Sequence, residues 1–173
     1  LLAYSRASSR ALDLKPVALN GLIDRVLAGL DFQIAEAGVE LAVAPDLPEV
    51  RGDEVLLGLL FQNLIGNALK YRREDGARIE IRTHAGPEGF AAVEIADNGI
   101  GFDMAFAQKI FEPFARLHGR EAYSGTGIGL AICQQAAERL GGRINVRSAP
   151  GEGSVFTVSL PLAAPHEGGS SAP

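Results

Sequence analysis

The feature that most limits the possible folds is an apolar segment from Asp53 to Tyr71. Its apolar residues fall on most sides of a helix rather than on one stripe, so a helix formed here must be largely buried. They are Leu56, Leu57, Leu59, Leu60, Phe61, Leu64, Ile65 and Leu69. Asp53 is a plausible N-cap for this helix.

Helix and strand patterns surround this segment. Asn20 can cap a helix that ends at Gly38, and Leu130 to Leu140 has helical periodicity that ends at Gly141 and Gly142. We also predict extended residues at Val17 and Leu19, a loop over 45–48 and a short helix over 103–111. The predicted strands lie at 39–43, 79–81, 91–95, 143–148 and 154–160, with hairpin turns at 86–89 and 150–153.

The composition of the chain excludes several classes of function. The chain has 173 residues, 47% of them apolar, which allows one compact α/β domain. Its formal charge of -5 argues against a nucleic-acid partner. We find no run long and apolar enough to span a membrane, so we expect no membrane contact. Cys133 is the only cysteine, which favours a reducing, cytoplasmic location and a core role over a redox thiol.

The two ends differ from the rest. Residues 1–10 look like the end of a helix from a preceding segment, and we assign 1–13 to it. Residues 163–173 are rich in Gly, Ser and Pro and are expected to be a disordered tail. The body of the domain is therefore predicted to be 14–162.

A polar stripe interrupts the apolar helix. Asn63, Asn67 and Lys70 are spaced by four and three residues, which places them within an arc of about 60°. An amide oxygen suits Mg²⁺, and a lysine one turn further along suits a phosphate. The alternative is that the asparagines only bond to neighbouring backbone, as a single helical Asn commonly does.

Two glycine-containing segments could form the rest of a site. Asp97 follows a predicted strand directly, where its carboxylate could accept a hydrogen bond from an amino group on a base, although Asp-Asn-Gly is also an ordinary turn. Gly125, Gly127 and Gly129 open a helix whose free N–H groups could bind phosphate oxygens. Their spacing fits neither a P-loop nor a dinucleotide-binding fingerprint.

The connection before these glycines is long, polar and without periodicity, which is typical of a lid or binding loop. Arg116, His118 and Arg120 lie in it and could close over phosphates. They could equally be solvated loop charges.

Five segments, taken in order, resemble the conserved boxes of the ATP-binding domain of sensor histidine kinases. The resemblance implies a Bergerat-type fold: a two-layer α/β sandwich with a mixed sheet of about five strands and three main helices on one face. It also implies ATP under a flexible lid. The segments are NLIGNALKY (63–71), DNGIG (97–101), IFEPFARL (110–117), GTGIGLAI (125–132) and GEGSVF (151–156).

The resemblance also implies roles for individual residues. Asn67 is similar to the Mg²⁺ ligand, and Lys70, Asn63 and Arg116 are expected to act on the phosphates during catalysis. Asp97 resembles the aspartate that recognises the adenine amino group, with Ser154 supporting it through water. The remaining residues implied to contact the nucleotide are Tyr71, Gly99, Ile100, Gly101, His118, Gly125, Thr126, Gly127, Gly129 and Leu130.

The resemblance distinguishes a kinase from an ATPase. Related ATPases of the superfamily carry a glutamate base where this chain has Asn63, and a neutral amide cannot take a proton from water. We therefore expect a protein-histidine kinase domain, with a hydrolysing ATPase or a silent nucleotide-binding module as alternatives. His84, His118 and His166 lack the helical acidic neighbour of a phosphate-accepting histidine.

The acceptor is therefore expected on a helical hairpin domain outside this chain, and residues 1–13 are expected to be the end of that hairpin's second helix. The response regulator's receiver domain is the further partner. The resemblance implies a homodimer for the full-length protein and a mostly monomeric piece here. The full-length protein could be anchored in a membrane through other segments.

Overall fold

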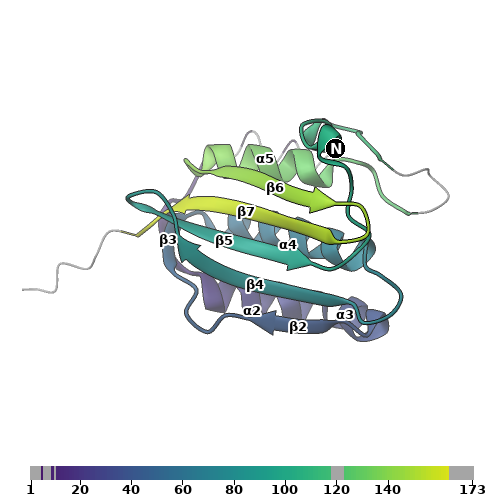
Figure 1. Ribbon diagram of the computed structural model, residues 1–173. Coiled ribbons are helices and arrows are strands. Elements are labelled where there is room, and N and C mark those ends of the chain that lie inside the picture. Colours follow the sequence, from purple (N-terminus) through teal and green to yellow (C-terminus); the bar gives the residue numbers. More distant parts are fainter. Residues whose placement is uncertain (1–4, 6–8, 10, 118–122, 164–173) are drawn as a thin grey trace, which may run out of the picture.

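Helices cover one face of a five-stranded sheet, which leaves the other face open (Figure 1). The computed structural model describes residues 5, 9, 11–117 and 123–163. Within these residues the helices are α2 (Leu19–Gly29), α3 (Asp31–Ala37), α4 (Glu54–Lys70) and α5 (Gly129–Arg139). The layered α/β arrangement predicted from the sequence is confirmed.

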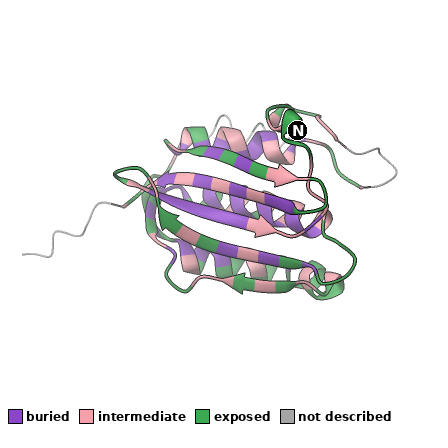
Figure 2. Cartoon of the chain, in the orientation of Figure 1, coloured by how far each residue is buried: buried purple, intermediate pink, exposed green. Residues whose placement is uncertain are grey.

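The main sheet is mixed, with strand order β2-β4-β5-β7-β6. Only the β2–β4 pair is parallel, and the other neighbours are antiparallel. Figure 2 shows that β5 is buried along most of its length, between β4 and β7. The strands are β2 (Glu40–Val43), β4 (Arg78–Ala85), β5 (Phe90–Asp97), β6 (Arg143–Ala149) and β7 (Gly153–Pro161).

A second, two-stranded sheet joins β1 (Lys15–Ala18) and β3 (Glu49–Gly52). β3 was not predicted from the sequence, and Leu19, which was expected to be extended, is the first residue of α2. β3 has only four residues, and Val50 is its one apolar side chain, so its alternation is too short to be recognised in the sequence. The strand is held by pairing with a distant segment. The small sheet connects to the main one through the Val50–Leu162 bridge.

α4 is the centre of the helical layer and lies between α2 and α5 (Figure 1). Phe61, Leu57, Leu60 and Ile65 have no exposed surface, in agreement with the predicted burial. Full burial of each such side chain stabilises a fold by roughly 1.5–3 kcal/mol. Cys133 of α5 is also fully buried, and its Sγ lies 3.5 Å from the Leu60 carbonyl oxygen. The core role predicted for this cysteine is confirmed.

Asn20 does not cap a helix, contrary to expectation. It lies inside α2, whose N-cap is Ala18, and its Nδ2 donates to the Ala44 carbonyl oxygen at 2.9 Å. The helix expected to run unbroken to Gly38 is divided at Leu30, which has ψ near 6° and leaves helical geometry. Within the described residues, this face therefore carries α2 and α3 where one helix was expected, beside α4 and α5.

The segment 103–111 also differs from prediction. It forms two 3₁₀ turns, η1 (Met104–Phe106) and η2 (Lys109–Phe111), instead of one short helix. The Asp103 carboxylate accepts from the Ala105 N–H at 2.8 Å, which satisfies one free donor at the start of η1. A following proline at 113 cannot extend the second turn as a helix.

Some expectations lie wholly or mostly outside the described residues. They concern the helix remnant in residues 1–10, the disordered tail after residue 163, and the lid residues His118 and Arg120. His166 also lies there. Among the described residues, no helix combines the length and apolarity that crossing a membrane requires.

Asp53 fixes the start of α4 and should matter for stability. Its buried carboxylate accepts from the Leu56 N–H at 3.0 Å and from the Asp13 N–H at 2.9 Å. We predict that Asp53→Ala lowers the free energy of unfolding by about 1–3 kcal/mol, because it removes an N-cap and leaves the buried Leu56 N–H without a partner. Urea denaturation measures this, with exposed Asp24→Ala as the matched control. Equal stability of the two variants would contradict the capping role.

Candidate functional site

The polar stripe of α4 borders a large hollow. Asn63, Asn67 and Lys70 all line it, and the opposite wall is the segment from Ser124 to Leu130. The hollow has a volume of about 550 Å³, which is within the usual range for small-molecule sites. The helical spacing thus brings the three side chains to one cavity, as the sequence indicated.

The two asparagines differ in their bonding. Asn63 Nδ2 donates to the Leu59 carbonyl oxygen at 2.8 Å, one turn earlier in α4. The Asn67 side chain makes no hydrogen bond to any residue that the structure describes. The backbone-bonding alternative therefore holds for the amide nitrogen of Asn63, whereas Asn67 keeps its amide available to a ligand.

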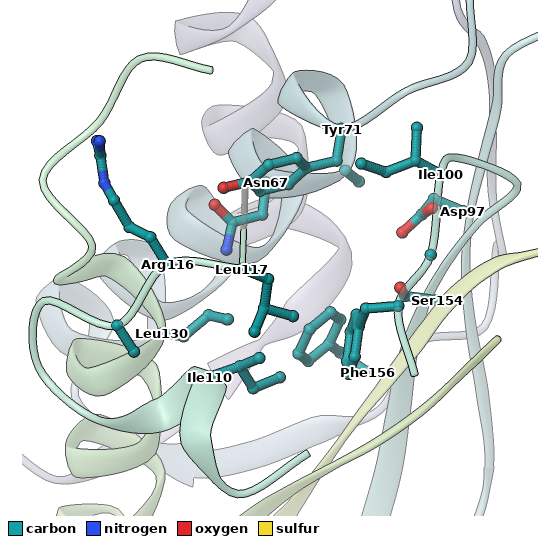
Figure 3. Close-up of a pocket in the computed structure, with 14 residues that line it drawn as sticks. Asn67, Tyr71, Asp97, Ile100, Ile110, Arg116, Leu117, Leu130, Ser154 and Phe156 are labelled. Carbon is teal, nitrogen blue, oxygen red and sulfur yellow. The ribbon is translucent and has the colours of Figure 1, made fainter. Parts of the chain in front are cut away.

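A narrower slot continues from Asn67 toward the end of β5. Figure 3 shows the side chains around it, with Asp97 and Ser154 on the side away from Arg116. Most of the wall is apolar, so a flat, uncharged ring would fit the slot better than a charged group would. The apolar wall includes Ile100, Phe102, Ile110, Leu117, Leu130 and Phe156.

Several of these wall residues were not anticipated. These residues are Phe102 before η1, Ile110 in η2, Leu117 in the loop after η2, and Phe156 in β7. Ile110, Leu117 and Phe156 lie in segments that resemble the family's boxes, and Phe156 is also an inward-facing residue of an alternating strand. The segments before β7 lack periodicity, so the direction of their side chains depends on the fold.

Asp97 places a carboxylate at the edge of the slot. Its Oδ1 accepts from the Gly99 N–H at 2.8 Å. Burial raises the pKa of this carboxyl, and hydrogen bonds from the backbone of Gly99 and Ser154 partly offset that rise. The side chain therefore sits in a poorly solvated place, where a hydrogen bond from a ligand would be stronger than in water.

A pair of serines lies beside Asp97. Ser154 faces Asp97 across the β5–β7 pairing, and its Oγ is 2.9 Å from Ser148 Oγ. Ser148 donates to the Gly153 carbonyl oxygen and accepts from the Phe102 N–H. Since the proton of Ser148 is already used, Ser154 is the donor between the two hydroxyls. Ser148 was not predicted from the sequence.

The glycines of the Asp97 loop serve close packing more than ligand contact. A Cβ on Gly99 would lie 2.3 Å from the Tyr71 carbonyl oxygen, and Gly99 does not line the slot. Gly101 lines the slot, has φ of 58°, and would bring a Cβ to 2.0 Å from the Ala149 carbonyl oxygen. Larger residues at either position would push the loop off the domain.

The second glycine segment sits against α4. A Cβ on Gly125 would lie 2.6 Å from Lys70 Nζ, and one on Gly129 would lie 2.9 Å from Asn63 Oδ1. Gly127 and Thr126 also border the hollow, and Leu130 borders both the hollow and the slot. All of the predicted residues in this segment are thus at the cavity, and the small size of the glycines allows the close approach.

Aromatic contacts hold the end of α4 to the far side of the long loop. The rings of Tyr71 and Tyr123 lie 4.9 Å apart, and Lys70 Nζ is 4.8 Å from the Tyr71 ring centroid. Tyr71 borders both cavities. Arg116 extends away from Asp97, toward the glycine segment (Figure 3).

His84 is remote from these cavities. It lies near the end of β4 opposite the Asp97 loop, roughly 16 Å along the strand from Ile79, the residue paired with Asp97. Its Nε2 is 3.8 Å from Glu94 Oε1, within an ionic cluster that includes Arg82 and Arg147. These arginines and the histidine lower the pKa of Glu94 despite its burial.

Comparison with known proteins identifies related sequences and folds. Residues 52–164 match the family described as histidine kinase-, DNA gyrase B- and HSP90-like ATPase. The chain is 40% identical over 162 residues to cyanobacterial phytochrome A of Nostoc sp., covering 94% of this chain and 21% of that protein. It is 36% identical to the phosphate regulon sensor protein PhoR of Pseudomonas aeruginosa, covering 91% and 36%. The chain therefore spans about a fifth to a third of these relatives.

Solved structures agree with the sequence matches. Full-length ShkA in complex with AMPPNP superposes with a TM-score of 0.80 at 29% identity, covering 94% of this chain and 34% of that one. A mycobacterial sensor histidine kinase, MprB, superposes with a TM-score of 0.76 at 29% identity, covering 86% and 97%. The fold and the order of its elements are thus those of histidine-kinase catalytic domains.

Burial of Asp97 predicts a pH-dependent stability effect. A raised carboxyl pKa means that the charged form destabilises the fold above that pKa, and that this cost disappears as pH falls through it. We expect Asp97→Asn to unfold at a higher or equal urea concentration than the wild type at pH 7, with the gap narrowing in acid. If Asp97→Asn were markedly less stable than the wild type at pH 7, the carboxylate would instead be structural.

Proposed function

The chain belongs to the family of histidine kinase-, DNA gyrase B- and HSP90-like ATPases and is an ATP-binding catalytic domain of the sensor histidine kinase type. On this premise we propose that it binds Mg-ATP and donates the γ-phosphoryl group to a histidine outside residues 1–173. The transfer breaks the bond between the γ-phosphorus and its bridging oxygen, forms a phosphorus–nitrogen bond to an imidazole, and leaves the electron pair on ADP.

The lining of the hollow supports transfer over hydrolysis. Among the residues that the structure describes, no Asp, Glu or His borders it. Efficient attack by water needs a general base within hydrogen-bond reach, and the Asn63 amide cannot accept a proton. An external imidazole brings its own nucleophilic lone pair, so it needs no such base from this domain.

The slot and the hollow suit different parts of the nucleotide. The apolar slot accommodates adenine, whose amino group would donate to the Asp97 carboxylate, with Ser154 beside it. The triphosphate would occupy the hollow, where Lys70 neutralises its charge and the N–H groups of Gly127 and Gly129 are available. Arg116 lines the slot, but its guanidinium lies beside Gly125, from where it can reach the phosphates. Tyr71 borders both cavities and is suited to contact the base.

The residues present fit Mg²⁺ only together with phosphate oxygens. The described part of the chain has no cluster of three His, Cys, Asp or Glu side chains able to hold a metal. Asn67 offers a neutral amide oxygen with no competing hydrogen bond among the described residues, and Mg²⁺ in nucleotide sites commonly takes one protein ligand plus phosphates and waters. When bound, the ion would withdraw charge from the phosphates.

The acceptor and the further partners belong to the longer protein. His84 is far from both cavities and paired with Glu94, so it is unsuited to receive the phosphoryl group. We infer that a helical hairpin domain supplies the acceptor, that the full-length protein is a homodimer, and that a response regulator receives the phosphoryl group. We place the domain in the cytoplasm, where ATP is available.

Nucleotide binding should depend on Asp97 and its magnesium requirement on Asn67. We predict that Asp97→Asn weakens Mg-ADP binding by 10-fold to 100-fold, roughly the value of a charge-assisted hydrogen bond. Asn67→Ala should remove most of the difference between affinities measured with and without Mg²⁺. Calorimetric titration measures both, with exposed Asn145→Ala as the control. Unchanged binding in both site variants would contradict the roles proposed for Asp97 and Asn67.

The isolated chain should transfer rather than hydrolyse. Incubated with radiolabelled ATP, it should release little phosphate and label itself negligibly, because the described site offers neither a base nor an acceptor. Addition of a histidine-bearing hairpin domain from a sensor-kinase relative should give labelled hairpin. Steady phosphate release without the hairpin would instead favour a hydrolysing ATPase. Binding without either reaction would favour a silent module.

A further inference from the structure

A shallow groove lies between α2 and the outer side of α4, separate from the slot. Its floor is mainly apolar, and Val55 on its rim is 64% exposed. An exposed valine and open apolar surface on two adjacent helices are costly to leave in water. The lining residues used below are Leu22, Val26 and Gly29 of α2 and Val55, Gly58 and Gln62 of α4.

Glycines in this surface have no packing reason within the described chain. Gly58 lines the groove and Gly66 lines the neighbouring hollow, and both lie inside α4, where glycine is among the least favourable residues. A Cβ at either position, or at Gly29, would meet no atom within 4 Å. This contrasts with Gly99 and Gly129, where a Cβ would collide with neighbours. The missing side chains leave room above the helix for an external element to approach closely.

The groove opens onto the phosphate-side hollow. Gln62 borders both, and the hollow extends along α4 to Leu59 and Gly66. For phosphoryl transfer the acceptor nitrogen must come to within about 3–3.5 Å of the γ-phosphorus. The segment that carries the acceptor histidine must therefore lie across the opening of the hollow. The groove is the surface of α4 directly beside that opening.

We propose that the groove between α2 and α4 is the docking surface for the helix that carries the phosphate-accepting histidine. Apolar side chains of that helix would pack against Val26, Val55 and Gly58, with the histidine at the Gln62 end. A third helix can pack against two neighbouring helices, because the ridges of side chains on one helix fit the grooves of the others. This inference rests on the proposed function.

The charged residues at one end of the groove support one orientation of the docked helix. Arg25 Nη2 lies 3.7 Å from Glu54 Oε1, and Lys15 Nζ lies 3.7 Å from Glu54 Oε2, at the end away from the hollow. These exposed charges bound the apolar stretch, so the contact surface runs from them toward Gln62. Substitutions in its middle can therefore block docking without reaching the nucleotide.

The test uses the full chain with a separately supplied hairpin domain from a sensor-kinase relative. Gly58→Arg and Val55→Arg should each lower the initial rate of phosphoryl transfer from radiolabelled ATP to the hairpin by at least tenfold. Calorimetric Mg-ADP affinity should stay within twofold of the wild type. Ala28→Arg is the matched control, because Ala28 is exposed on α2 but does not line the groove. It should transfer at the wild-type rate.

The outcomes separate this inference from the proposed function. Undiminished transfer in both groove variants, with active wild type, overturns the docking surface and leaves the kinase function standing. A loss of Mg-ADP affinity that matches the loss of transfer also overturns it. If sedimentation shows that the wild-type chain dimerises alone and Gly58→Arg abolishes that dimer, the groove joins two copies and the inference fails. A wild-type chain that binds Mg-ADP but never labels the hairpin contradicts the proposed function itself.

Discussion

The burial of α4 is the constraint on which the rest of the structure depends. A helix with fully buried residues such as Phe61 and Ile65 must pack between two others and against a sheet. That position turns the Asn67 and Lys70 side of the helix toward a cavity rather than toward solvent. These polar groups are thus half-buried, and a charged ligand that fills the cavity would displace water from them, so its interactions would be stronger than at an open surface.

The Asp97 loop is attached to the end of this same helix. The Ile100 N–H donates to the Tyr71 carbonyl oxygen at 3.0 Å, and the Gly151 N–H donates to the Ile100 carbonyl oxygen at 2.7 Å. The helix end, the β5 loop and the β6–β7 turn are therefore one connected unit. Its rigidity fixes the distance between the adenine side and the phosphate side of the proposed site, which is what positioning catalysis requires.

The elements that could be predicted from the sequence are those with strong periodicity or with capping and turn residues close in sequence. The α4 helix, its Asp53 cap, the β4–β5 hairpin and the final two strands follow from residues close in sequence. Features that depend on long-range contacts could not be predicted. They include β3, the position of Asn20 inside α2, and the contribution of Ile110 and Leu117 to the slot wall. The spacing of Asn63 and Asn67 predicted a shared cavity, but it could not predict that Asn63 Nδ2 would bond to Leu59 while the Asn67 amide stays available.

The most direct test is a crystal structure of the chain with Mg²⁺ and a non-hydrolysable ATP analogue, which shows whether the polar stripe of α4 and the Asp97 loop form one nucleotide site. We expect the adenine in the slot, with its amino group donating to the Asp97 carboxylate. We also expect the metal on the Asn67 amide oxygen, and Asn63 Nδ2 still donating to the Leu59 carbonyl oxygen. An analogue bound elsewhere, with the slot closed by Ile110 and Phe156, would contradict this single nucleotide site.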